Sequence, residues 1–114
     1  MLFRSNYTKH QVYAASGATG SSSATSQTAI AGGVGYTATG CFSTSITDFY
    51  NYGKTDSYKI VKTLSGRDIN SDGSVFFRSG AWLNASAITS FTIVPTSGAT
   101  TILEYSTFGL YGVK

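Results

Sequence analysis

Short stretches in which large apolar or aromatic side chains alternate with polar ones recur along the chain, and clusters of Gly, Ser, Asn and Asp separate them. A period of two residues is typical of half-buried β-strands, and helical spacing is hard to find. The pattern predicts strands over 6–15, 34–39, 41–50, 57–64, 75–83, 88–94 and 105–113. We therefore expect an all-β fold, an antiparallel and jelly-roll-like β-sandwich, with a small barrel as its closest rival.

Three of these strands carry more detailed expectations. The strand over 6–15 is polar enough to lie at a sheet edge. Gly80 within 75–83 predicts a bulge or a close approach of another part of the backbone. The strand over 57–64 is expected to divide its side chains between two faces, with Tyr58, Ile60, Lys62 and Leu64 on one and Lys59, Val61 and Thr63 on the other.

Polar segments between the strands predict loops. Residues 16–28 contain small and hydroxyl-bearing side chains that bury little surface, so we expect an exposed Gly/Ser-rich loop there. Residues 51–56 and 65–73 are rich in the residue types that reverse the chain. Pro95 lacks the amide that a ladder needs and should end the strand before it.

Composition narrows the class of protein. The 114 residues suit a single domain, and an aromatic content of 14% is enough for a packed core. The eight basic residues are scattered, with a net charge of +3, which does not favour nucleic acid as a partner. No apolar run approaches the roughly 20 residues that span a bilayer, so no membrane insertion is expected.

The cysteine content and the first residues add two further expectations. Cys41 is the single cysteine, so no intrachain disulfide can form and Cys41 is expected to fill space in the core. The opening segment Met1-Leu2-Phe3-Arg4-Ser5 matches what a common sequencing-adapter tail would encode. This leaves open a native start further upstream, with a first strand missing from residues 1–114.

Two segments carry a resemblance to a known family. Residues 80–91 read Gly-Ala-Trp-Leu-Asn-Ala-Ser-Ala-Ile-Thr-Ser-Phe, and 106–114 read Ser-Thr-Phe-Gly-Leu-Tyr-Gly-Val-Lys. Together they resemble a domain of tailed-bacteriophage virion proteins in which a Trp, a Ser-Ala-Ile-Thr-Ser run and a terminal Ser-Thr-Phe-x-Leu-Tyr-Gly motif follow in this order. The resemblance covers nearly the whole chain, strongly in the last third and loosely before it. Gly109, where a polar residue is more usual, is a departure.

The resemblance implies a jelly-roll-like fold used in tail fibres, tail-tip adhesins or capsid decoration, often as trimers. We accordingly expect a non-enzymatic module on the virion surface, whose partners are copies of itself in a homotrimer, other virion proteins and a host surface glycan. Capsid decoration without host recognition is the first alternative. A fragment of a polysaccharide depolymerase is the second.

Aromatic residues next to turns are candidates for ligand binding. Exposed rings can stack on the apolar face of a sugar while nearby polar groups take its hydroxyls. Such residues are expected where loops cluster at strand ends. The candidates are Tyr50, Asn51, Tyr52 and Trp82. The competing interpretation is that these rings fill the core, as aromatic rings on strand faces usually do.

Residues 68–73 reproduce the front of a calcium loop, with side-chain oxygens from Asp68, Asn70 and Asp72 at alternate positions, followed by Gly73. The closing carboxylate is missing, because Ser79 stands at the twelfth position. An Asx-rich hairpin turn is the favoured interpretation, with calcium as the alternative.

Catalytic candidates are weak. His10 is the single histidine, and no nucleophile-elbow sequence accompanies the many serines. Glycoside hydrolysis needs two opposed carboxylates. The five acids are Asp48, Asp56, Asp68, Asp72 and Glu104, four of them in or beside predicted turns.

Overall fold

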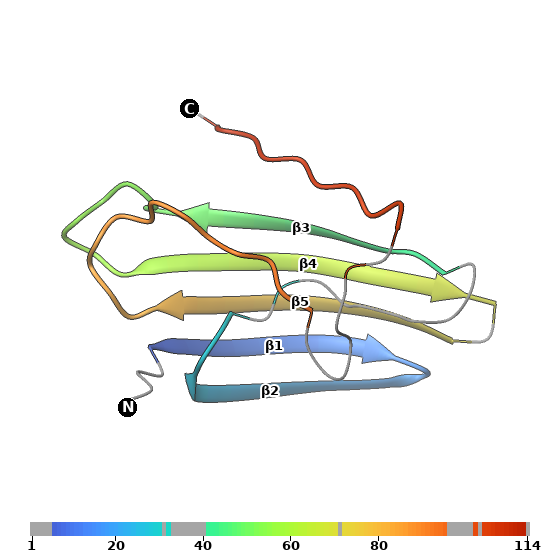
Figure 1. The fold of residues 1–114 in the computed structure, drawn as a ribbon. Coiled ribbons are helices and arrows are strands. Elements are labelled where there is room, and N and C mark those ends of the chain that lie inside the picture. Colours follow the sequence, from blue (N-terminus) through green and yellow to red (C-terminus); the bar gives the residue numbers. More distant parts are fainter. Residues whose placement is uncertain are drawn as a thin grey trace.

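The computed structural model describes residues 6–30, 32, 41–70, 72–95, 102 and 104–113. These residues contain five strands, β1 (Tyr7–Ala15), β2 (Ala18–Gln27), β3 (Ser43–Tyr50), β4 (Lys59–Ile69) and β5 (Asp72–Trp82). All neighbours are antiparallel, and the strands form one sheet in the order β2-β1-β5-β4-β3 (Figure 1). The all-β prediction is confirmed. The described residues form one sheet, so a sandwich within the chain is not confirmed.

A tight hairpin joins β1 and β2. Its two turn residues, Ser16 and Gly17, both have positive φ (48° and 80°), as a type I′ turn requires. The loop predicted over 16–28 is therefore this turn followed by β2. Small polar side chains do not prevent pairing here, because the ladder with β1 uses backbone groups. As a result β1, which was expected at an edge, lies between β2 and β5.

The second hairpin joins β4 and β5. The chain reverses within 65–73 as predicted, but the turn is much shorter than that range, since β4 continues to Ile69, which pairs with Asp72. Two polar side chains pair across the strands near the turn. Arg67 Nε donates a hydrogen bond of 3.1 Å to Ser74 Oγ, so these two side chains pair with each other in the strands instead of with water in a loop.

The predicted strands at the C-terminal end do not join the sheet. Residues 83–95 form an irregular segment that crosses the sheet in Figure 1, and 106–113 are extended without a ladder partner among the described residues. Single backbone hydrogen bonds and side-chain packing hold the first segment: the Ile88 amide donates to the Tyr52 carbonyl oxygen at 2.7 Å, and Phe91 stacks on Phe49 with ring centroids 5.2 Å apart. The strand predicted over 34–39 lies outside the described residues.

The two faces of the sheet differ in their cover. The inner face, over which residues 83–95 lie, carries Val61, Thr63, Ser65 and the side chains in register with them, including Phe49, Phe76, Arg78 and Trp82. The outer face carries the alternate residues, including Val12, Ile46, Ile60, Leu64, Val75 and Phe77. The division of residues 58–64 between two faces is confirmed. Of the four large aliphatic residues of β4, Ile60 and Leu64 nevertheless face outward, and Val61 and Ile69 face inward.

Polar groups dominate the buried positions. Val61 is the one buried hydrophobic residue of the described part, whereas Lys59, Thr63, Ser65 and Ser74 are buried and polar. Thr63 and Thr47 hydroxyls are 3.1 Å apart across β4 and β3. Arg78 Nε donates to the side-chain oxygen Oε1 of Gln11 at 3.0 Å, and the guanidinium lies over the Phe76 ring. Burial lowers the pKa of Arg78 from its ordinary value.

Gly80 marks a close approach, as its position in the sequence predicted. A Cβ atom there would lie 3.0 Å from both the Ile30 Cγ2 atom and the Thr8 carbonyl oxygen. The side chain of Ile30 thus packs directly on the backbone of β5.

Lys59 ties residues 83–95 to the inner face. Its side chain is fully buried, and Nζ donates to the carbonyl oxygens of Ser57 at 2.5 Å and Ala85 at 2.9 Å.

We expect Lys59→Met to lower the free energy of unfolding by about 1–3 kcal/mol, because buried carbonyl groups lose a charged donor. Urea denaturation measures the change. Lys54→Met at an exposed turn position is the matched control and should stay within about 0.5 kcal/mol. Equal losses in both variants would contradict this role.

Candidate functional site

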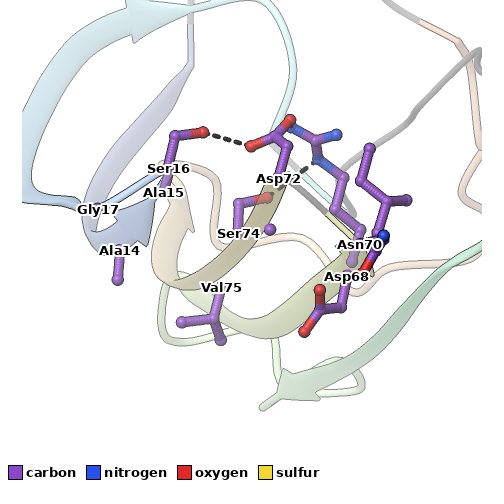
Figure 2. Close-up of a pocket in the computed structure, with 12 residues that line it drawn as sticks. Ala14, Ala15, Ser16, Gly17, Asp68, Asn70, Asp72, Ser74 and Val75 are labelled. Carbon is purple, nitrogen blue, oxygen red and sulfur yellow. Dashed lines mark hydrogen bonds and ion pairs between the residues drawn. The ribbon is translucent and has the colours of Figure 1, made fainter.

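The two hairpin turns lie together at one end of the sheet and border a pocket of about 620 Å³ (Figure 2). The Ser16 amide donates to the Gly73 carbonyl oxygen at 3.0 Å. The Ser16 hydroxyl donates to Asp72 Oδ1, the contact that a dashed line marks in Figure 2. Backbone and side chain of one residue thereby fix the β1–β2 turn against the start of β5.

The Asp72 carboxylate is already paired. Its Oδ2 atom accepts from Arg67 Nη2 at 2.8 Å, in an ion pair whose two side chains are mostly buried. The hydrogen bond from Ser16 is the main reason that the pKa of Asp72 lies below its ordinary value, and the guanidinium of Arg67 lowers it further. Both carboxylate oxygens are thus engaged by protein donors.

The predicted calcium ligands do not converge. Ile69 pairs with Asp72 in the hairpin, so Asp68 and Asp72 point to opposite faces of the sheet, as Figure 2 shows. Calcium needs six to eight oxygen ligands around one point. In the described part of the chain no group of three His, Cys, Asp or Glu residues is placed to hold a metal ion. This geometry favours the Asx-rich hairpin turn over the calcium site.

The opposite end of the sheet gathers exposed tyrosines. Tyr50 ends β3, and Lys62 Nζ lies 5.1 Å from the centre of its ring. Asn51 adopts a left-handed conformation with φ of 59° and begins the turn, whose Lys54 amide donates to the Asn51 carbonyl oxygen at 3.0 Å. Tyr52 is 61% exposed, and Tyr58, which the sequence did not single out, is 57% exposed. Tyr50, Asn51, Tyr52 and Tyr58 are named the tyrosine rim below.

Trp82 does not join the tyrosine rim. It pairs with Lys59 in the ladder and lies half-buried on the inner face, whereas Tyr50 lies on the outer face at the same end of the sheet. The four residues predicted to bind a sugar are therefore divided, with Tyr50, Asn51 and Tyr52 together and Trp82 apart from them.

The sequence did not reveal an apolar row on the outer face. Val12 pairs with Phe77, Phe77 with Leu64, and Leu64 with Ile46, so four neighbouring strands place these side chains at one level. These four residues are named the outer row below. Their exposed fractions are 55%, 49%, 52% and 67% in that order. The alternation within each strand indicates which residues share a face of that strand. The sequence does not show the register between strands, which is what brings these four side chains to one level.

The catalytic candidates are dispersed. His10 is exposed on the outer face of β1, in a second open pocket bordered by Val12 and Phe77. Asp48 lies in the middle of β3, across from Lys62. Asp68 and Asp72 lie at the far hairpin on opposite faces, so neither presents a carboxylate opposed to the other.

Comparisons with known proteins found no matching family model, no similar curated protein and no similar solved structure. The resemblance to phage virion domains therefore stays a prediction. The described residues include no helix that is long and apolar enough to cross a membrane.

The paired Asp72 predicts a pH dependence. A carboxyl whose folded pKa is lowered contributes stability above its ordinary value of 3.8 and loses it as the pH falls through the folded value. Asp72→Asn should lower Tm near neutral pH and flatten the fall of Tm below about pH 4. Circular dichroism melts at a series of pH values measure this. Asp68→Asn, at the same hairpin but on the other face, is the control. An Asp72→Asn profile parallel to that of the unaltered protein would show that the pairing is unimportant.

Proposed function

We propose that the chain is a non-enzymatic structural and attachment module on the surface of a tailed-phage particle. The observation that carries this proposal is the outer row, because a flat sheet with a contiguous apolar row left open suits a subunit of a larger assembly. The closing motif at 106–112 resembles the virion domains and supplies the phage assignment. Copies of the chain and other virion proteins are its partners, with a trimer as the number of copies that the resemblance implies.

The tyrosine rim supports the attachment role. Tyr50 and Tyr52 present ring surfaces at the end of a sheet, beside the Asn51 side chain and the ammonium group of Lys62. Rings for stacking and polar groups for hydroxyls are the combination that recognises sugars. The ligand of this rim is therefore a neutral or acidic glycan of the host surface. Each single site would be weak, and repeated copies on one particle would supply avidity.

Capsid decoration is the alternative for the same assembly surface, and it requires no glycan contact. The depolymerase alternative gains no support, because the described carboxylates do not form an opposed pair. We therefore propose that the module has no catalytic centre.

Glycan binding by the purified protein distinguishes attachment from capsid decoration. We expect Tyr52→Ala to reduce binding of the purified protein to host-surface glycans by roughly five- to thirtyfold, since a stacking contact is worth on the order of 1–2 kcal/mol. Tyr105→Ala is the matched control, because Tyr105 is similarly exposed but lies outside the rim. Glycan arrays read out the binding, and circular dichroism confirms folding.

Immunogold labelling of phage particles locates the protein. Label on the tail supports attachment, label on the head without glycan binding supports decoration, and unlabelled particles would refute the proposed function. Sugar release by the pure protein would refute the non-enzymatic assignment.

A further inference from the structure

The outer row is continuous with further apolar residues. Val75 lies on the same face at the level next to Phe77, so the apolar surface extends along β5, whereas Ile60 lies beyond the polar level formed by Lys62 and Ser79. Single exposed apolar residues are ordinary on a protein surface. A contiguous group on a flat sheet marks an interaction surface.

The inner face does not provide a hydrophobic core. Among the described residues only Val61 is both apolar and buried, and its buried neighbours Thr63 and Ser65 are polar. A chain of this size has little stability to spare and depends on a buried apolar core. The described residues place their largest set of apolar side chains on the outer face instead, where a second layer could cover them.

We propose that the outer row packs against the outer row of a second copy of this chain, so that two sheets together form one β-sandwich. The inference rests on the proposed function only in that both make the chain a subunit of an assembly, and it replaces the trimer that the resemblance implies with a pair. Antiparallel sheets commonly pack face to face about 10 Å apart, with apolar side chains filling the layer between them.

The area of the face fits such a pair. Five strands at ~4.8 Å make a sheet about 24 Å wide, and the 11-residue strands β4 and β5 extend about 36 Å at ~3.3 Å per residue. The face therefore offers roughly 800 Å², which is the area that each partner contributes to a stable interface of standard size.

The position of Phe77 gives the contact its symmetry. β5 is the middle strand of the five, and Phe77 lies on it between Val12 and Leu64. A two-fold axis over Phe77, parallel to the sheet and across the strands, therefore places the outer row on the outer row of the partner. An axis along the strands superposes Val12 and Leu64 but places Ile46 over β2.

The charged groups of the face permit this arrangement. With the axis along the strands, Lys62 meets His10 of the partner subunit, and with the axis across them it meets Gly66 of the partner subunit. Asp48 meets a serine or threonine position in both cases. Neither orientation places two lysines or two aspartates opposite each other.

The C-terminal segment is the competing occupant. Residues 106–113 are apolar and extended, but they run beyond the β3 edge in Figure 1 and leave the outer row open. Phe108, Leu110 and Tyr111 are 63%, 77% and 85% exposed, so they contact little of the sheet. The test must distinguish this segment from a second copy.

Sedimentation equilibrium of the full chain over about 1–200 μM tests the pairing. We expect a dimer for the unaltered protein, and an association that is weakened at least tenfold or lost in Leu64→Asp alone. Leu64→Asp should shift the protein to single copies, because the charge would be buried between sheets. Leu110→Asp is the matched control at an exposed leucine of the C-terminal segment, and it should leave the pair intact.

Cross-linking gives a second readout that survives a folding defect in Leu64→Asp. Because facing sheets are too far apart for a direct disulfide, a short bis-maleimide is applied to Phe77→Cys in a Cys41→Ser background. We expect a cross-linked pair. Tyr58→Cys in the same background, at a similarly exposed position on the sheet end, should give little product.

Three results would overturn the inference. The first is a protein that stays monomeric at all concentrations, and the second is a pair that Leu110→Asp disrupts but Leu64→Asp does not. The third is a trimer in which Phe77→Cys gives no cross-links. These failures differ from failure of the proposed function. Single copies found on phage particles would refute the pairing alone, and paired protein missing from particles would refute the virion assignment alone.

Discussion

Alternation along a β-strand places neighbouring residues on opposite faces of the sheet, and every other feature of this chain depends on which face is covered. In β4 the residues Val61, Thr63 and Ser65 lie under cover, while Ile60 and Leu64 lie in the open. A single layer of irregular chain over one face cannot also shield the other. The exposed apolar row is the consequence.

Hydrogen bonds give the inner face its register but little apolar stabilisation. Thr47 with Thr63 and Arg67 with Ser74 join side chains of neighbouring strands, and Lys59 fixes the crossing segment to the sheet. Each such bond contributes about 1 kcal/mol net. The buried Ser65 hydroxyl finds no partner among the described residues, which costs roughly as much again. A second layer on the outer face would supply the hydrophobic burial that this polar interior lacks.

The sequence predicts strand type and facing better than it predicts pairing. The strands at 41–50 and 75–83 and the alternation around Val61 follow from side-chain periodicity. The strand β2 could not be foreseen from residues 16–28, since its stability comes from backbone hydrogen bonds and a Ser-Gly turn rather than from apolar side chains. Residues 88–94 have strand-like composition but pack across the sheet by side-chain contacts and the Ile88 backbone hydrogen bond instead.

For the candidate sites too, the sequence predicted where residues lie along a strand but not which residues of other strands they meet. Tyr50 to Tyr52 lie at a strand end, as their turn residues indicated. Trp82 lies on the other face, because it pairs with Lys59 of β4 whereas Tyr50 pairs with the next residue, Ile60, and this register cannot be read from the sequence. Asp68 and Asp72 matched a loop motif in sequence, yet a tight hairpin turns them away from each other.

Solvent exposure of the outer-face methyl groups tests the central claim most directly. In an NMR spectrum of the protein at high concentration, a soluble paramagnetic agent broadens the signals of methyl groups that water reaches. If two sheets enclose the outer row, the methyl signals of Ile46 and Leu64 should stay sharp while those of Leu110 and Val113 broaden. Equal broadening of all four would show that the outer row remains in water, and would contradict the account.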